Sequence, residues 1–108
     1  MILALLALAT LQVDHDPRCD STVYNELLGC AYDAWQTADQ ELNEQWRRMP
    51  HPERLIEAQR AWLVWRDLEC TSQNGAIGGR EELIWQYGCL AELTNDRTRQ
   101  LQTQYRWL

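Results

Sequence analysis

The chain of 108 residues contains no lysine, no phenylalanine and only two histidines. Its ten basic residues are all arginines, and sixteen acids outnumber them, which gives a formal net charge of −6. A net acidic chain repels phosphate backbones, so the charge argues against nucleic acid as a partner. The longest apolar run covers about ten residues near Met1, whereas a bilayer requires roughly 20. We therefore expect no stable membrane span.

Catalytic and metal-binding motifs are also missing. There is no Ser/His/Asp set, and His15 and His51 lie in expected loops without ligand spacing to the cysteines. Glu41 and Glu44 imitate the acid pair of a glycosidase, but neighbouring carboxylates are common on helix surfaces and nothing indicates a cleft. We expect neither an enzyme nor a bound metal or other cofactor.

The first thirteen residues have the apolar composition of a secretory signal, with Ala7-Leu8-Ala9 as a cleavage motif. No basic residue comes directly after Met1, which departs from the usual signal and is explained by a start that is truncated or wrongly assigned. The alternative to a signal is a buried N-terminal helix. We expect residues 1–13 to be the signal and residues 14–108 to form a single domain that is periplasmic or secreted.

Four cysteines in a short exported chain predict two disulfides. Three connectivities are possible, and we expect the sequential one, Cys19–Cys30 and Cys70–Cys89. In one straight helix Cys19 and Cys30 would lie roughly 16 Å apart, at about 1.5 Å per residue, which is too far for a disulfide. We therefore expect a bend at Gly29, between a short helix and a longer one.

Apolar residues recur at helical spacing through most of the chain, and no segment alternates as a strand does. The pattern predicts long helices over residues 30–49, 53–70 and from 81 onward, with Pro50 and Pro52 ending the first. Residues 71–80, which are rich in glycine, are expected to form a loop. The fold class is thus all-α, a small disulfide-stapled helical bundle of three main helices plus a short N-terminal helix.

Polar side chains interrupt the expected apolar faces of these helices. On the second helix, Gln59 and Arg66 share a stripe with Trp62 that periodicity predicts to be buried. An unpaired buried arginine costs several kcal/mol, so such residues need partners. We expect a buried network that fixes the register of the helices, with an open polar pocket as the alternative. The expected members of this network are Asp39, Asn43, Gln59, Arg66 and Arg97.

Several motifs occur in a fixed order: ADQELN at residues 38–43, AQRAWLVWRDLEC at 58–70, the loop GAIGG, and CLAELTNDRTRQL at 89–101. Together with the four cysteines they resemble the LprI-like family of bacterial envelope proteins, the lysozyme inhibitor LprI N-terminal domain. The resemblance implies a helical fold with internal disulfides and, from the best-known member, inhibition of a basic c-type lysozyme. It supplies no inhibitory residues to carry over.

Charge suggests where such a partner would bind. Residues 14–46 carry eight acids against one arginine, a formal sum of −7. A basic partner would be steered to this acidic helix, while the glycine-rich loop could enter a cleft of the partner. The candidate partner-binding residues are Asp33, Glu41 and Glu44 on the helix, and Gly75, Gly78, Gly79 and Arg80 in the loop.

Six tryptophans add a second class of contact, because tryptophan is enriched at binding hot spots. Trp85 and Trp107 fall off the main apolar stripe of the third helix and are the candidates for exposure. The other four are expected in the core: Trp35, Trp46, Trp62 and Trp65. The alternative function is a structural or stress-related envelope domain with a different protein partner and no inhibitory activity.

Overall fold

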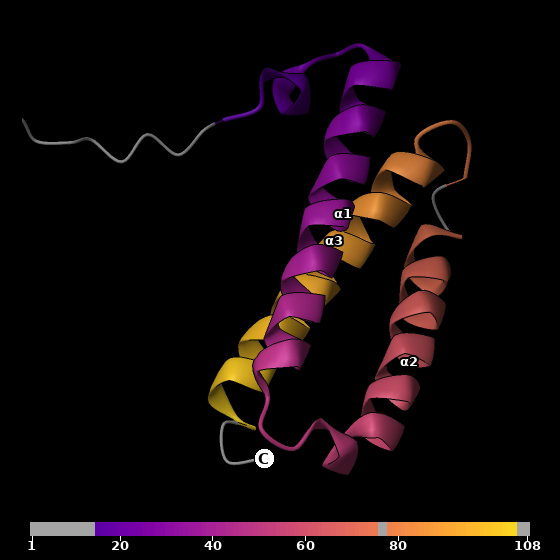
Figure 1. Ribbon diagram of the computed structural model, residues 1–108. Coiled ribbons are helices and arrows are strands. Elements are labelled where there is room, and N and C mark those ends of the chain that lie inside the picture. The colour runs from indigo at the N-terminus through magenta and orange to yellow at the C-terminus, as the bar shows by residue number, and fades with distance from the viewer. Residues whose placement is uncertain (1–14, 76–77, 106–108) are drawn as a thin grey trace, which may run out of the picture.

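The computed structural model describes residues 15–75 and 78–105, and every regular element in these ranges is helical (Figure 1). The expected all-α bundle is confirmed. Its elements are the 3-10 helix η1 (Pro17–Asp20), α1 (Tyr24–Arg48), the 3-10 helix η2 (Pro52–Arg54), α2 (Ile56–Asn74) and α3 (Glu82–Thr103). The expected signal segment and Trp107 lie outside the described residues. Within the described ranges, no helix combines the length and apolar character needed to cross a membrane.

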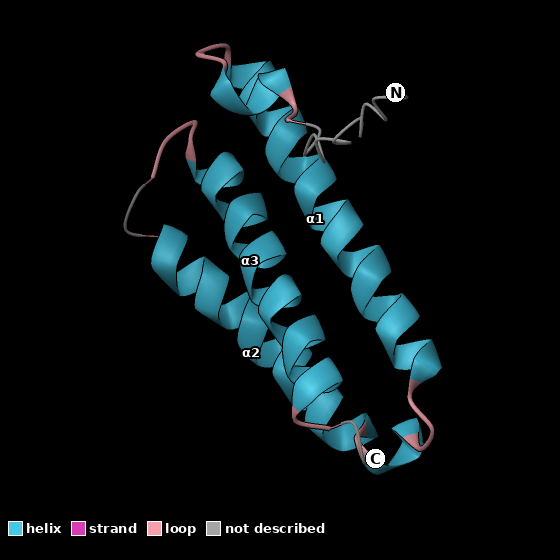
Figure 2. Ribbon diagram, turned by 90° about the vertical axis from the view of Figure 1, so that its left-hand side faces the viewer, coloured by secondary structure: helices cyan, strands magenta, loops and turns pink. Residues whose placement is uncertain are grey.

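The third helix is the common packing partner of the other two. Most contacts between helices join α1 to α3, α2 adds a smaller set to α3, and α1 and α2 scarcely contact each other. Figures 1 and 2 show the resulting open arrangement, in which α1 runs beside α3 and α2 lies apart from α1. The seam between α2 and α3 is therefore separate from the seam between α1 and α3.

The apolar core lies at the end of the bundle where α1 leads into α2 and where α3 ends. Each buried leucine side chain contributes about 1.5–3 kcal/mol relative to exposure, so this cluster holds the three helices together. Its buried members are Leu42, Met49, Leu55 and Leu101, and Trp46, Trp62 and Tyr105 pack against them.

An aromatic cluster joins α1 to α3 nearer the opposite end. The rings of Trp35 and Tyr87 are stacked, with their centroids 5.7 Å apart. Tyr32 meets both rings edge-on, at 6.2 Å from Trp35 and 5.3 Å from Tyr87. These pairs give α1 and α3 a second contact region beyond the apolar core.

Gly29 does not bend the chain, so that expectation was wrong. Helix α1 runs without interruption through Gly29, and η1 instead folds back against the side of α1. This reversal brings Cys19 and Cys30 together, with a Cα–Cα distance of 5.4 Å. A Cβ atom at position 29 would lie 2.9 Å from Nη1 of Arg18. The glycine therefore allows the Arg18 side chain to approach α1 closely.

The second helix extends one turn beyond Cys70, as far as Asn74, which corrects the expected loop boundary. The side chain of Asn74 is buried and donates a hydrogen bond of 2.6 Å to Oε1 of Gln86 on α3. A tertiary partner of this kind supports the additional turn despite its polar sequence. Residues 71–74 are thus helical, and the connection to α3 begins at Gly75.

Candidate functional site

The expected polar network is formed only in part. On the α2–α3 seam, Arg97 donates through Nε to Oε1 of Gln59 at 2.9 Å. Arg66 bonds to Asp67, with Nη2 at 2.9 Å from Oδ1, and its Nη1 donates to Oγ1 of Thr94 at 3.3 Å. These partners come from α2 and α3 alone.

Asp39 and Asn43 do not join that network, which corrects the five-residue prediction. Both lie on α1, where the side chain of Asn43 is exposed and Asp39 is half-buried. Neither residue is among the hydrogen-bond partners that Arg66 and Arg97 have in the described ranges. The physical reason is the packing: α1 scarcely contacts α2, so its side chains do not reach the α2–α3 seam.

The structure contains two disulfides with the sequential connectivity. Cys19 joins η1 to α1, and Cys70 joins the end of α2 to Cys89 on α3, with a Cα–Cα distance of 5.6 Å in the second pair. Closing segments of this length stabilises a fold by roughly 3 kcal/mol through the entropy of the unfolded chain. Both disulfides lie towards the end of the bundle that carries the α2–α3 connection.

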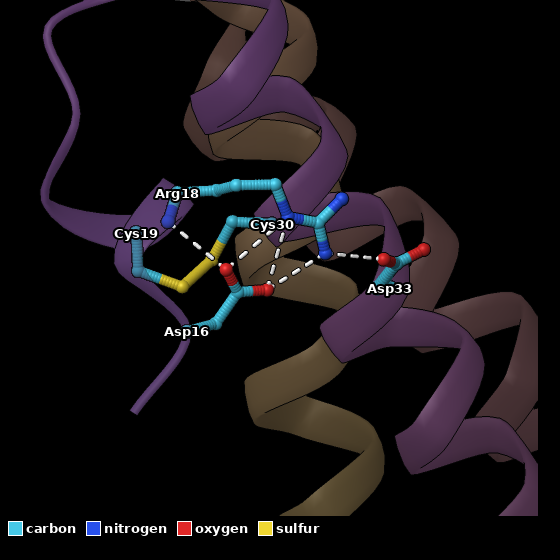
Figure 3. Close-up of polar contacts among 5 residues, drawn as sticks. All are labelled: Asp16, Arg18, Cys19, Cys30 and Asp33. Carbon is cyan, nitrogen blue, oxygen red and sulfur yellow. Dashed lines mark hydrogen bonds and ion pairs between the residues drawn. A yellow bond between two sulfur atoms is a disulfide. The ribbon is translucent and has the colours of Figure 1, made fainter. Parts of the chain in front are cut away.

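One of the acidic candidates on α1 is already paired within the protein (Figure 3). The Arg18 guanidinium bonds to Asp33, and it also contacts Asp16 with Nη2 at 2.7 Å from Oδ2. The hydrogen bonds from Arg18 hold the pKa of Asp16 below its ordinary value, and the two carboxylates raise the pKa of Arg18. Asp33 is therefore a partly neutralised charge rather than a free one.

The other two acidic candidates face solvent. Glu41 and Glu44 are both exposed on α1. Glu44 lies 3.9 Å from Nη2 of Arg48, one turn further along the helix, which is a weak surface pair. Glu41 thus presents the least compensated carboxylate of the three predicted on this helix.

Two glycines of the loop adopt backbone conformations that other residues rarely adopt. Gly78 and Gly79 have φ angles of +66° and +73°, in the left-handed region that favours glycine, and their Cα atoms face open space. Gly75 instead ends α2 with a right-handed φ of −60°. Arg80 lies over the ring of Tyr24, with its Cζ atom 4.4 Å from the centroid. This contact connects the loop to the start of α1.

An exposed aromatic surface adjoins this loop. It is formed by the start of α1 (residues 22–27) and by the loop with the start of α3 (residues 78–86), and we call these two segments together the loop end. Trp85 is 55% exposed, Leu83 two positions before it is exposed, and Val23 at the start of α1 is exposed as well. A groove of about 330 Å³ is lined by Tyr24, Ile84 and Trp85 among others. A second groove of about 380 Å³ shares Tyr24 and is lined by Arg80 and Leu83. The loop end thus combines exposed apolar area with concave surface.

The charges at the loop end are mainly negative. Glu81 and Glu82 open α3 and are both exposed, and each lines one of the two grooves. Glu26 on α1 is exposed as well, and its carboxylate accepts a hydrogen bond from the Ser21 hydroxyl. Of the predicted contact residues, Arg80, Gly78 and Gly79 are brought together here with Trp85, whereas Glu41 and Glu44 lie further along α1.

Sequence reasoning missed one exposed tryptophan. Trp65 was expected in the core but is 48% exposed, at the edge of a cleft between α2 and α3. The signal was available, because Trp65 does not belong to the stripe of Gln59, Trp62 and Arg66 that faces α3.

Comparison with known proteins agrees with the motifs. Residues 19–101 match the family model described as Lysozyme inhibitor LprI. An uncharacterized protein of Rhizobium meliloti (strain 1021) is 34% identical over 107 residues, which covers 80% of this chain and 77% of that protein. No solved structure matches the chain. With a family match over most of its length, four cysteines in two disulfides and a wholly helical described fold, the chain belongs to the LprI lysozyme inhibitor family.

Proposed function

We propose that this protein is an exported protein-binding domain that inhibits a basic c-type lysozyme through its loop end. The observation that carries the proposal is Trp85, a large aromatic side chain that is 55% exposed and lines one of the two grooves of the loop end. Tryptophan supplies much of the binding energy at interfaces when a partner desolvates it. A partner surface that covers Trp85 would also fill the groove that Trp85 lines.

Charge supports a basic partner at this surface. Glu81 and Glu82 stand next to the apolar patch, so a basic protein would meet complementary charge around a central aromatic anchor. The acidic face of α1 has a different role in this proposal. Glu41 and Glu44 lie outside the loop end and would accelerate the encounter by long-range attraction, whereas Asp33 is compensated by Arg18.

Export agrees with the covalent structure. Two disulfides persist in oxidising compartments such as the periplasm or the extracellular space and are rare in reducing ones. We propose that residues 1–13 direct the chain to the periplasm or beyond, where a lysozyme would be encountered.

The test compares two tryptophans of similar exposure. The oxidised protein is titrated by calorimetry into a c-type lysozyme, and lysis of cell-wall substrate is followed in parallel. Trp85→Ala should weaken binding by at least about 2 kcal/mol, or roughly 30-fold in Kd, and relieve inhibition accordingly. Trp65→Ala is the matched control, because Trp65 is 48% exposed but lies on α2 away from the loop end, and it should retain wild-type affinity.

Charge-reversal variants distinguish acidic residues that contact the lysozyme from those that only attract it over a longer range. Glu81→Lys should speed dissociation, whereas Glu41→Lys should slow association with little change in the dissociation rate, and only at low salt. Absence of binding at both low and physiological salt, from oxidised and helical protein, would refute the proposal. Equal losses for Trp85→Ala and Trp65→Ala would refute the assignment to the loop end.

A further inference from the structure

A cleft between α2 and α3, far from the loop end, contains a buried arginine, Arg97, that has no carboxylate partner within residues 15–75 and 78–105. The cleft has a volume of about 480 Å³, and its walls include Trp62, Trp65, Leu93, Arg97, Gln100 and Gln104. Arg97 is only 5% exposed. In the described parts of the chain its hydrogen bonds go to the amide oxygens of Gln59 and Gln100, which are neutral.

The neighbouring arginines differ from Arg97 in this respect. Arg66, which is 7% exposed, is paired with Asp67. Arg99 at the rim of the cleft is paired with Asp96. A buried guanidinium normally has an anionic partner, because burying a charge without one is costly. Arg97 is stabilised instead by the faces of Trp62 and Tyr105, whose centroids lie 5.7 and 5.3 Å from its Cζ atom.

The amides around Arg97 present further donors to the cleft. The oxygen of Gln100 accepts from Arg97, and its Nε2 in turn donates to Oε1 of Gln104 at 3.2 Å. Gln104 lines the cleft, and its Nε2 takes no part in this chain of amides. Nη2 of Arg97 donates to no acceptor within residues 15–75 and 78–105. The polar side of the cleft therefore offers donors from Arg97, and the one carboxylate among its described lining residues, Asp96, is already paired with Arg99.

We propose that this cleft binds a carboxylate group carried on a flat, apolar body. The carboxylate would accept from Arg97 and from the Gln104 amide, since a guanidinium fork matches the geometry of two carboxylate oxygens. The flat body would lie against Trp65, which forms the exposed aromatic edge of the cleft. A cleft that selects an anion on a chain of net charge −6 does so by local geometry, because the overall field repels anions.

The same carboxylate chemistry can come from a free acid or from a side chain of a protein, and the experiment has an arm for each. In the first arm, benzoate and the neutral, equally shaped benzamide are titrated into the full chain, and the indole N–H signals are followed by NMR. In the second, a capped peptide amide with one glutamate next to a phenylalanine, which supplies the flat apolar body, is compared with its glutamine counterpart. Binding of benzoate alone identifies a free acid as the source, and binding of the glutamate peptide identifies a protein side chain.

The expected result is a charge preference that depends on Arg97. The acidic ligand should bind at least about tenfold more tightly than its neutral counterpart, with shifts at Trp62 and Trp65, because hydrogen bonds to charged groups are the stronger ones. Arg97→Gln should reduce that ratio to about one, while Arg60→Gln, an exposed arginine on α2, should leave it unchanged. Trp65→Ala should weaken binding of both benzoate and benzamide by about fivefold.

Equal affinity for the acidic and neutral members of both ligand pairs would overturn the proposal. So would an Arg60→Gln variant that loses as much as Arg97→Gln, since the effect would then arise from diffuse charge. If Arg97→Gln fails to fold by circular dichroism, the wild-type ratio and the Trp65→Ala variant decide the question alone. The outcome is independent of lysozyme binding, because Trp85→Ala should not alter any of these signals.

Discussion

The close approach of Arg18 to Gly29 gives a prediction in which two opposing effects can be separated. A glycine inside a helix is destabilising by roughly 0.5–1 kcal/mol relative to alanine, so Gly→Ala in α1 or α3 should ordinarily stabilise the protein. At position 29, however, the added Cβ would lie 2.9 Å from Nη1 of Arg18. The guanidinium must then move away from Asp16 and Asp33, which it now contacts.

Gly88 provides the matched control. It lies within α3, and a Cβ atom there would meet nothing within 4 Å. We expect Gly88→Ala to raise the free energy of unfolding by about 1 kcal/mol. Gly29→Ala should also stabilise, because the tip of an arginine side chain is flexible, but by distinctly less than Gly88→Ala.

The assay is urea unfolding of the oxidised protein, followed by circular dichroism. In an Arg18→Ala background there is no guanidinium to displace, so Gly29→Ala should recover the full gain seen at position 88. The reasoning would be refuted if Gly29→Ala equalled Gly88→Ala in the wild type. It would also be refuted if the deficit at position 29 persisted after Arg18 was removed, because the cause would then lie in the helix itself.

Two further predictions concern the same end of the bundle. The pKa of Asp16 is lowered in the folded protein by the hydrogen bonds from Arg18, so its stabilising contribution should be present above the unfolded pKa of about 3.9 and be lost as pH falls through the folded value. Urea unfolding between pH 6 and pH 2 should show this loss, and Arg18→Ala should flatten it; an unchanged slope would exclude Asp16 as its source. Replacing Cys70 and Cys89 by alanine should lower the free energy of unfolding by roughly 3 kcal/mol in chemical denaturation, and a loss below about 1 kcal/mol would contradict the entropic account of this disulfide.

Local periodicity was sufficient to predict three long helices and the glycine connection, because each helix buries one stripe. It failed where tertiary contacts decide the outcome. The extra turn of α2 depends on Asn74 meeting Gln86, a residue twelve positions away on another helix. Gly29 was read as a bend because its partner Arg18 belongs to a separate element, and no local rule reveals that the side chain folds back over α1.

At the candidate site, too, local sequence predicted which residues are exposed or buried, whereas tertiary packing decided which residues pair. Exposure of Trp85 followed from its position off the stripe, and composition predicted the loop that contains Gly78 and Gly79 but not the left-handed φ of the two glycines. The polar residues could be assigned to buried faces, but their partners could not, because pairing depends on which helices adjoin. Asn43 was placed in a network that requires α1 to contact α2, and the packing of both helices on α3 prevents it.

The position of the second disulfide has a consequence for proteolysis. Cys70 and Cys89 flank the whole connection between α2 and α3, including Gly78 and Gly79 at its exposed surface. A protease that cleaves this connection would leave two fragments that are still covalently joined, with Trp85 retained on the α3 fragment. Such a nicked molecule would migrate as an intact chain until it is reduced. Where proteases are abundant, cleavage of the backbone in this connection would therefore not by itself release the proposed binding surface from the bundle.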